Sequence, residues 1–555
     1  MSNRENKRKM SNVLIRVRSY AEHSTIKCLP KLVHSKSMPH KVLWLFTFVS
    51  GVAIGLYLLS GLWNTYFSYQ VTLSISAKEE GRPPFPDVTV CNLNPLWDNA
   101  PNWGLLARID GVADPLTYDQ YIYLLYTTMY KPESNDTVFE GTNQELYSVS
   151  GYLKHTEYDN TVLDDLGKSF IWKCVWQGEK QSKNCSVRPI ITPTNGLCYT
   201  IRPPLGDGIN VKTRQEGMSV ILFLNNLDIR FVADYRISPF QSYTEGVKVL
   251  LHPQGTVPQM VEGFTVSPGS EANVVAKYYR RSILPFPYGN CANELKLNIF
   301  SNINAEDVWN YTKYACTSLC YQNKVINNCG CLDSTEITNS KLTTKYRFCS
   351  IFSVRNMNET ISEMECTRRA KARLDVLNTC IKICHVPCDW SFYKISINQV
   401  PWPHEIYILA LYYTYMRSRH LPEEFQTFYA SAVEYAMKGN TTEATKLVKS
   451  TNLIQRNFLQ LSITMDDTIT TEEDQPAIKL EALFGSLGGI LNLWIGFTFI
   501  TIMEVIDFFL TIIMDKFCYT KVYDDRGKKK GVTPMSVEAT DTDLFTVWKK
   551  RQLDS

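Results

Sequence analysis

Hydrophobic positions in this chain are concentrated in two long runs. Residues 42–63 are 22 consecutive residues without a charge, which is enough for a helix to cross about 30 Å of hydrocarbon. The second run, residues 483–514, is 32 residues long and contains only two charged residues, Glu504 and Asp507. No stretch between residues 64 and 482 has such a pattern. We therefore predict two transmembrane helices, the first of which starts too far into the chain to be a signal peptide.

Shorter patterns predict a mixed α/β domain between the two runs. Apolar and polar residues alternate over 71–76, just after the first run, and over 459–465, before the second. Two strands that continue into the membrane helices can pair near the membrane surface, which would couple the domain to the helices. The other predicted elements are strands at 218–224 and 246–252, a helix at 118–129 and a long amphipathic helix at 403–438.

The charges beside the two runs orient the chain. Residues 1–41 contain ten Lys or Arg and two Glu, and six Lys or Arg follow the second run between residues 516 and 530. Positively charged flanks of membrane helices remain in the cytosol, so we predict that both termini are cytosolic. The protein is then expected in the plasma membrane, with membrane lipid around its helices. A net charge of +3 gives no indication of a nucleic-acid partner. The predicted parts are a cytosolic segment (1–41), a first transmembrane helix (42–63), an extracellular domain (64–482), a second transmembrane helix (483–514) and a cytosolic tail (515–555).

The cysteines independently support this topology. Fourteen of the sixteen lie between the runs, and an even number outside the cell fits up to seven disulfides. The same region contains five candidate glycosylation sites: Asn135, Asn184, Asn310, Asn358 and Asn440.

Two cysteine pairs have helical spacing. Cys316 and Cys320 lie four residues apart in one helical pattern, and Cys380 and Cys384 lie four apart in another. Antiparallel helices would join Cys316 to Cys384 and Cys320 to Cys380. A column of up to five bridges would then result, with Cys329, Cys331, Cys349 and Cys366 inside these pairs and Cys291 and Cys388 outside. The competing interpretation is a zinc site, because Cys329 and Cys331 are closely spaced, but the nested even count favours disulfides and no metal.

The second run contains the main candidate functional segment. Four glycines (Gly485, Gly488, Gly489 and Gly496) precede Phe497 and Thr498, and the acidic pair Glu504 and Asp507 follows. Small residues permit unwound backbone beside a water-filled cavity, where carbonyls and hydroxyls can replace a cation's hydration shell. The alternative is ordinary helix packing, with the acids paired to Lys516 or lipid headgroups. We predict no enzyme and no cofactor, because no Ser/His/Asp, HExxH or phosphate-loop pattern occurs in the predicted extracellular domain.

The chain resembles the degenerin/epithelial sodium channel family from about residue 24 to 515. The resemblance is carried by several motifs in order: Phe85-Pro-Asp-Val-Thr-Val-Cys91, Gly196-Leu-Cys198-Tyr-Thr, Leu284-Pro-Phe-Pro-Tyr-Gly289-Asn-Cys291, Tyr314-x-Cys316-x3-Cys320, Pro387-Cys388 with Trp402-Pro403, and Gly488-Gly489 through Gly496-Phe-Thr to Glu504.

The resemblance implies a homotrimeric, sodium-selective, amiloride-blocked channel with palm, thumb, finger and knuckle regions in each extracellular domain. It also implies the bridges Cys91–Cys198 and Cys174–Cys185. The family's selectivity motif falls on Gly496, Phe497 and Thr498, and the position at which bulky substitutions hold family channels open falls on Gly485. The family's cytosolic His-Gly dipeptide is replaced by Lys27-Cys28, whose fixed positive charge is expected to oppose cation conduction.

Within the family, the similarity leans toward the invertebrate FMRFamide-gated sodium channels. This implies a short amidated, FMRFamide-like neuropeptide as the ligand, and residues 100–170 combine the tyrosines and carboxylates that suit one. The alternatives are acid gating, which is disfavoured because residues 66–72 lack a histidine, and mechanical or constitutive opening. More distant alternatives are an ATP-gated purinergic channel and a two-span surface receptor.

Overall fold

The computed structural model describes residues 17–26, 28–79, 83–93, 106–129, 151–152, 154–156, 167–177, 182–203, 217–225, 244–293, 295–297, 309–338, 340–372, 374–417 and 421–521. The chain divides into two compact units. Residues 69–477 form the sheet unit, and residues 1–68 with 478–555 form the helical unit.

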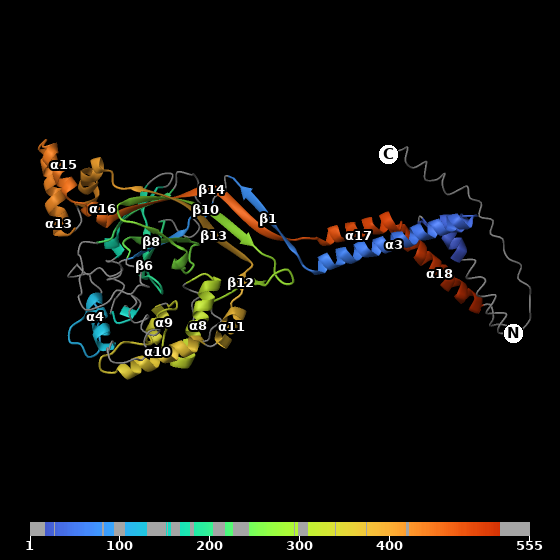
Figure 1. Cartoon of the computed structure of the whole chain (residues 1–555), viewed down its shortest axis with the longest axis horizontal. Helices are drawn as coiled ribbons and strands as arrows, with labels where there is room; N and C mark the ends of the chain where they lie inside the picture. Colours follow the sequence, from blue (N-terminus) through green and yellow to red (C-terminus); the bar gives the residue numbers. More distant parts are fainter. Residues whose placement is uncertain are drawn as a thin grey trace, which may run out of the picture. The chain divides into compact units, whose positions relative to one another are not determined.

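The sheet unit is built around two β-sheets (Figure 1). The larger has the strand order β13-β10-β14-β7-β3-β4, with β1 paired to β14. Its strands are β1 (Val71–Lys78), β3 (Ile171–Gln177), β4 (Ser182–Asn184), β7 (Gly217–Phe223), β10 (Ser270–Ser282), β13 (Asp389–Pro401) and β14 (Phe458–Pro476). The smaller, β5-β6-β2-β8-β9, consists of β2 (Asp87–Asn92), β5 (Ser186–Thr192), β6 (Gly196–Arg202), β8 (Val247–His252) and β9 (Phe264–Val266).

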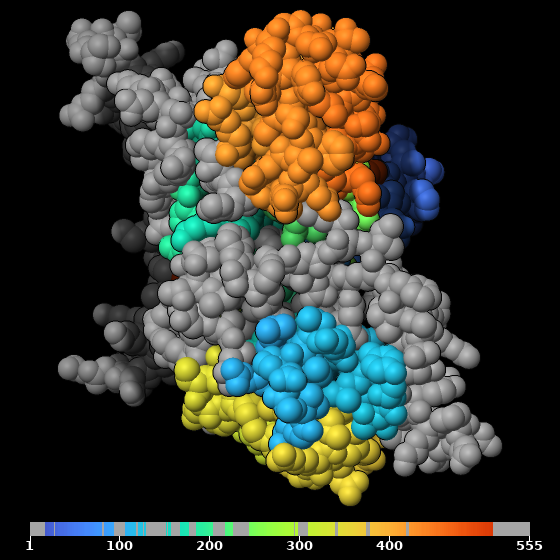
Figure 2. Space-filling model, turned by 90° about the vertical axis from the view of Figure 1, so that its left-hand side faces the viewer, coloured from blue at the N-terminus to red at the C-terminus, as the bar shows by residue number. Residues whose placement is uncertain are grey.

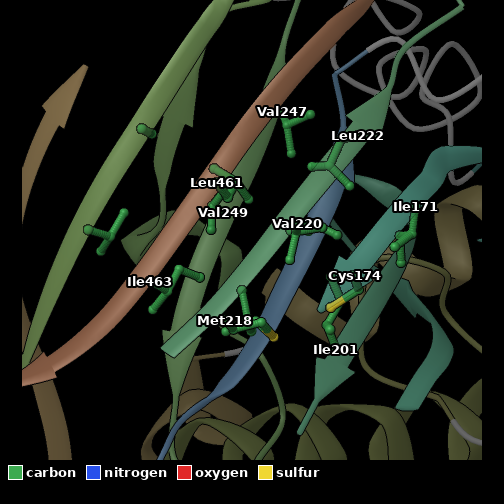
Figure 3. Close-up of a cluster of buried hydrophobic side chains, with 14 of the residues drawn as sticks. Ile171, Cys174, Ile201, Met218, Val220, Leu222, Val247, Val249, Leu461 and Ile463 are labelled. Carbon is green, nitrogen blue, oxygen red and sulfur yellow. The ribbon is translucent and has the colours of Figure 1, made fainter. Parts of the chain in front are cut away.

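Side chains from both sheets form the main hydrophobic core. Leu461 and Ile463 of β14 and Val247 and Val249 of β8 belong to one buried cluster, which Figure 3 shows in close-up. Burying each such side chain contributes about 1.5–3 kcal/mol, so the cluster joins the two sheets firmly. The strands predicted at 218–224 and 246–252 are confirmed as β7 and β8.

The long strand β14 has different partners along its length. Residues 458–464 pair with β7 and residues 460–473 pair with β10, whereas residues 469–476 pair antiparallel with β1. The strand predicted after the first hydrophobic run and the strand predicted before the second are therefore both confirmed, as β1 and β14. The register differs from the simplest expectation, because β1 pairs with the later half of β14 and not with residues 459–465.

A stapled group of helices forms a second part of the sheet unit. It contains α8 (Lys313–Cys329), α9 (Ser340–Lys345), α10 (Met357–Ala372) and α11 (Leu374–Ile383), and a short parallel pair, β11 (Cys291–Ala292) and β12 (Val386–Pro387), lies at its end. The structure contains seven disulfides: Cys91–Cys198, Cys174–Cys185, Cys291–Cys388, Cys316–Cys384, Cys320–Cys380, Cys329–Cys366 and Cys331–Cys349. The antiparallel pairing predicted for the two helical Cys-x3-Cys patterns is present, and the zinc alternative is wrong because these thiols are consumed in disulfides.

The predicted helix at 118–129 is present as α4 (Tyr118–Met129). It packs against the α10 region through a buried cluster that includes Tyr121, Phe352 and Met364. The space-filling view shows the two segments in contact, in cyan and yellow (Figure 2).

The single helix predicted over 403–438 is wrong. The segment is divided into η2 (Glu405–Tyr407), α12 (Ile408–Leu411), η3 (Tyr412–Met416), α13 (Glu423–Phe425), η4 (Gln426–Ala430) and α14 (Ser431–Met437), followed by α15 (Thr441–Ser450) and α16 (Leu453–Asn457). Pro422 precedes α13 and cannot continue a helix from the preceding turn, so the chain begins a new helix there. The parts of this segment before and after Pro422 pack together through the rings of Tyr412 and Tyr429.

The helical unit contains α2 (Leu29–His34), α3 (Met38–Phe67), α17 (Leu480–Trp494) and α18 (Phe499–Lys521). Among the described helices, α3 alone is long and apolar enough to cross a membrane by itself, with a mean hydropathy of 2.2. Helices α17 and α18 meet the same condition only together, and they are bent by 74° at the break between them. The run 483–514, predicted as the second transmembrane helix, is thus divided into two helices, and the break falls at Gly496-Phe497-Thr498.

Candidate functional site

The break in the second hydrophobic run is built by a glycine and a threonine. Gly496 has a φ of 77°, a left-handed conformation that glycine adopts without steric cost and that commonly ends helices. Its amide donates to the carbonyl of Asn492 at 3.1 Å, and the amide of Phe497 donates to Leu491 at 3.2 Å. These bonds use carbonyls at the end of α17, so the chain leaves the helix without losing its hydrogen bonds.

Thr498 begins the next helix as its cap. The amide of Thr501 donates to the Thr498 hydroxyl at 3.4 Å, and the amide of Thr498 donates to the Thr501 hydroxyl at 3.2 Å. This reciprocal pair has the logic of a capping box, with threonine in place of the usual glutamate. The Thr498 hydroxyl is thereby fixed at the break, next to Phe497 in the chain.

Two glycines of α3 allow close packing against α17. A Cβ added to Gly51 would lie 2.8 Å from the carbonyl oxygen of Trp494, and one added to Gly55 would lie 3.6 Å from the Ile495 side chain. Small residues of this kind let apolar helices approach each other in lipid. No local sequence pattern predicts this contact, because the two glycines are 443 and 440 residues from Trp494 and Ile495.

The three glycines of α17 differ from those of α3, because no described residue packs closely against them. A Cβ added to Gly485, Gly488 or Gly489 would have no heavy atom within 4 Å. In contrast to Gly51, these positions have no partner in the helical unit as described, so one face of α17 is left for lipid, water or another copy.

The two acidic residues of the run differ in their contacts. Glu504 accepts hydrogen bonds from both the amide and the hydroxyl of Thr25, at 3.1 and 3.2 Å. The Thr25 hydroxyl also lies 2.7 Å from that of Thr501, which is fully buried. Asp507 is exposed. The N-terminal segment therefore folds back onto α18, a contact that sequence reasoning missed because 479 residues separate its partners.

The Lys27-Cys28 pair follows this contact directly. Cys28 is half-buried with a free thiol, and it precedes α2. Lys27 lies outside the described residues. The proposed effect of its charge on conduction therefore remains a prediction.

The predicted peptide-binding region, residues 100–170, lies largely outside the described residues. Two of its tyrosines, Tyr121 and Tyr152, are fully buried in the cluster around α4. The hydroxyl of Tyr152 donates to the carbonyl of Leu116 at 3.1 Å. These two rings therefore serve the core and do not present a binding surface.

The sheet unit has a large cavity elsewhere, with a volume of about 1350 Å³. It lies between β8, the start of α8 and β13, and its lining includes the rings of Tyr311, Trp390 and Phe392 and the carboxylates of Glu262 and Asp389. Burial raises the pKa of Tyr311 to about 12, so its hydroxyl remains a hydrogen-bond donor at physiological pH. Aromatic rings beside carboxylates are suited to a ligand that carries both a ring and a cation.

A buried histidine also lines this cavity. Burial lowers the pKa of His252 to about 4, and its Nε2 lies 2.8 Å from the Thr89 hydroxyl. The folded pKa is below the ordinary value, so the unfolded chain takes up a proton first as the pH falls. We therefore expect the buried, neutral His252 to stabilise the folded state fully above about pH 6.5. As the pH falls toward 4, the free energy of unfolding should decrease by about 3 kcal/mol in total.

The variant His252→Gln keeps a polar side chain that can accept a hydrogen bond from the Thr89 hydroxyl, and it cannot titrate. Its thermal melting temperature, measured on detergent-purified protein, should therefore fall less than that of the wild type between pH 6.5 and 4. His404→Gln, at an exposed histidine, is the control and should follow the wild type. Equal pH profiles for all three proteins would show that His252 is not the group responsible.

The candidate glycosylation sites lie in different surroundings. Asn310, Asn358 and Asn440 are exposed, and the Oδ1 atom of Asn440 caps α15. The amide nitrogen of Asn310 is engaged, because it donates to the carbonyl of Gln254 at 2.9 Å. Asn135 lies outside the described residues, and Asn184 is in β4. All five stay predictions.

Comparison with known proteins places these features in one family. The profile of the family described as "Amiloride-sensitive sodium channel" matches residues 20–508. The FMRFamide-activated amiloride-sensitive sodium channel of Cornu aspersum is 24% identical over 532 residues, covering 86% of this chain and 80% of that protein. Acid-sensing ion channel 2 of Rattus norvegicus is 23% identical over 90% of this chain and 87% of its own length. The epithelial sodium channel subunit alpha of Neoceratodus forsteri is 21% identical over 88% and 78%, respectively. The chain therefore belongs to the amiloride-sensitive sodium channel family, whose members are plasma-membrane ion channels and not enzymes.

Proposed function

We propose that three copies of this chain form a sodium-selective cation channel that an extracellular FMRFamide-like peptide opens and amiloride blocks. The observation that carries this proposal is the break at Gly496-Phe497-Thr498. Non-helical backbone at membrane depth is tolerated only where protein buries it or where it lines a water-filled cavity. A break held by a left-handed glycine and a capped threonine therefore supports an ion pathway more than a simple membrane anchor.

In this proposal, the residues of the break form the selectivity filter. Three copies around a symmetry axis would bring three sets of carbonyls and Thr498 hydroxyls into one ring. The capping bonds between Thr498 and Thr501 hold that hydroxyl in place, and its extra methyl group narrows the ring compared with the serine usual in the family.

The open glycine face of α17 would meet the other copies. A Cβ at Gly485, Gly488 or Gly489 would have no neighbour within 4 Å among the described residues, and small residues permit the close approach of helices that a closed gate requires.

The acidic residues would form the cytosolic mouth. Asp507 is exposed, whereas Glu504 accepts two hydrogen bonds from Thr25. Thr25 is then a positioning residue that holds the N-terminal segment against the second span, with Lys27 two residues further along the chain.

Two observations support a peptide ligand. The relative from Cornu aspersum is named for activation by FMRFamide. The cavity between β8 and β13 supplies rings and carboxylates, which are the groups that would contact the phenylalanines and the arginine of such a peptide. In contrast, His155 and His252 have pKa values lowered to about 4 by burial, so neither takes up a proton in mild acid.

The test is voltage-clamp recording from oocytes that express the chain alone. We expect FMRFamide to evoke an inward sodium current that amiloride blocks, and acid near pH 6 to evoke none. A current evoked by acid alone would contradict peptide gating and leave the channel assignment intact. No current under any stimulus, with normal surface labelling, would contradict the homomeric channel.

The cavity is tested separately with Trp390→Ala. This variant should require more FMRFamide for half-maximal current without changing sodium selectivity. Trp309→Ala, at a half-buried tryptophan that is not among the cavity residues, is the control. An unchanged peptide response in Trp390→Ala would place the peptide elsewhere.

A further inference from the structure

One turn of the sheet unit presents an apolar tip to its surroundings. Phe286 is 88% exposed, the highest value among the large exposed hydrophobic side chains that the structure describes. Pro285 and Pro287 on either side of it are exposed as well. A run of exposed apolar residues on a folded domain commonly marks a surface that contacts another molecule or a membrane. The channel function proposed above assigns no role to this tip.

Hydrogen bonds close the turn behind the tip. The amides of Tyr288 and Gly289 both donate to the carbonyl of Pro285, at 3.1 and 3.3 Å. A Cβ added to Gly289 would lie 2.4 Å from the carbonyl oxygen of Leu284, so the chain can pass this close to itself only with glycine there. The backbone of the turn is therefore fixed, and the exposure of the tip is part of the fold.

Both sides of the turn are also anchored to Cys388. The amide of Ile283, just after β10, donates to the carbonyl of Cys388 at 2.8 Å. Cys291, where β11 begins on the other side of the turn, forms a disulfide with Cys388. A tip held in this way loses little further conformational freedom when it contacts another surface, which favours binding.

A ring contact places the turn near the point where the chain leaves α3. The rings of Tyr288 and Tyr69 lie edge to face, with their centroids 5.4 Å apart. Tyr69 follows Phe67, the last residue of α3, by two residues, which span at most about 7 Å of chain. Chain connection alone therefore keeps the turn close to the end of α3.

That end of α3 has the features of a lipid–water interface. The helix has 30 residues and is about 45 Å long, more than the ~30 Å of hydrocarbon that it has to cross. Trp63, Tyr66 and Phe67 form a group of rings in its last turns, and such rings are enriched at this depth. Residues 283–289 contain no charge, so no charged group of the turn would have to enter the interface.

We propose that Phe286 and the two prolines beside it insert into the interface of the outer lipid leaflet next to α3. The partner of the apolar tip is then membrane lipid. The proposal rests on the topology of the proposed channel, because it requires the sheet unit to lie outside the cell. Lipid contact would attach the base of the stapled helices to the membrane surface, because the turn continues into the Cys291–Cys388 bridge.

The test is the quenching by lipid of a fluorophore at the tip, in full-length protein reconstituted into nanodiscs. The variant Cys28→Ala/Cys518→Ala/Phe286→Cys leaves one free thiol for the environment-sensitive probe NBD, because the other fourteen cysteines form the seven disulfides. We expect blue-shifted emission from position 286. A phosphatidylcholine that carries a nitroxide near its headgroup should reduce this emission.

Ile406→Cys in the same background is the control, because Ile406 is 77% exposed and also apolar. The neighbouring Ile408 belongs to a buried cluster with Phe458, which begins β14. The 19 residues of β14 separate that cluster from the end that pairs with Val71 by about 60 Å. A probe at position 406 should therefore emit as in water and lose no emission to the nitroxide lipid.

Two results would overturn the proposal. One is an emission from position 286 that equals that from position 406 and is not reduced by the nitroxide lipid, because the tip would then lie in water. The other is a blue-shifted emission that the nitroxide lipid leaves unchanged, because the tip would then contact protein, either a second copy or another partner.

Current evoked by FMRFamide in oocytes that express Phe286→Cys separates this proposal from channel function. Quenching by lipid in a protein without current would leave the lipid contact standing and contradict the channel. Normal current from a protein whose tip lies in water would contradict the lipid contact alone.

Discussion

Replacing Gly485 by phenylalanine is expected to raise the standing sodium current of the proposed channel about tenfold or more. A Cβ at this position meets no heavy atom of the described residues within 4 Å, so the backbone of α17 can carry a side chain here without a clash at the Cβ. In the proposed trimer, the ring would enter the contact between copies of α17. Overpacking at such a contact costs about 1–3 kcal/mol, which would destabilise the closed arrangement relative to the open one. Two-electrode voltage clamp in the absence of ligand measures the change.

Gly61→Phe is the matched control, because a Cβ at Gly61 of α3 also has no neighbour within 4 Å. It should leave the standing current unchanged. The extra current of Gly485→Phe must be blocked by amiloride, or it reports a damaged membrane. An unchanged current at normal surface expression would contradict the assignment of Gly485 to the gate.

Removing both bridges between α8 and α11 is expected to cost much more than removing either one. Cys316 and Cys320 are four residues apart on α8, and their partners Cys384 and Cys380 are four residues apart on α11. While one bridge remains, the other closes a loop of only about ten residues. Removing that second bridge should therefore lower the free energy of unfolding by about 2–3 kcal/mol. Without both, the next bridges enclose a far longer loop, and the loss rises to about 6 kcal/mol. A loss of that size approaches the total stability of many domains.

The variants are the cysteine-to-alanine pairs, singly and combined. Surface biotinylation and thermal melting of purified protein should show a moderate decrease for each pair and near-complete loss for the combination. Cys28→Ala, at a free thiol of the helical unit, should behave as the wild type. If one pair alone abolished folding, the bridge would act through something other than loop closure.

Much of the fold follows from local patterns in the sequence. Alternating residues identify β1 and the first part of β14, and the Cys-x3-Cys spacing identifies two facing helices, because each depends on residues a few positions apart. The run 483–514 is predicted as one transmembrane helix because it is mostly apolar and contains only two charged residues, and hydropathy does not register a left-handed backbone at Gly496. The helix at 403–438 failed for a related reason, since Pro422 divides a pattern that otherwise remains periodic.

The candidate site could be predicted only where it lies in one segment. Gly496, Phe497 and Thr498 are consecutive, and the sequence places them together. The Thr25–Glu504 contact and the packing of Gly51 on Trp494 join residues more than 440 positions apart, and no local pattern marks either partner. Composition alone also does not separate binding tyrosines from core tyrosines in residues 100–170, because the rings of Tyr121 and Tyr152 are buried in a core. The binding role of the rest of that region stays a prediction.

The pairing of β1 with β14 also determines how the sheet unit yields to force. Val71 pairs with Pro476, so the strand ends that continue toward α3 and α17 lie at the same end of this ladder, closed by the bond from Ala477 to Gln70. A sideways pull on the two ends would load one rung at a time and peel the ladder gradually from that end. A pull along the strand axis would instead load the whole ladder in shear, together with the parallel β10–β14 pairing beyond it. The β1–β14 ladder should therefore separate easily under a sideways pull and resist a pull along its strands.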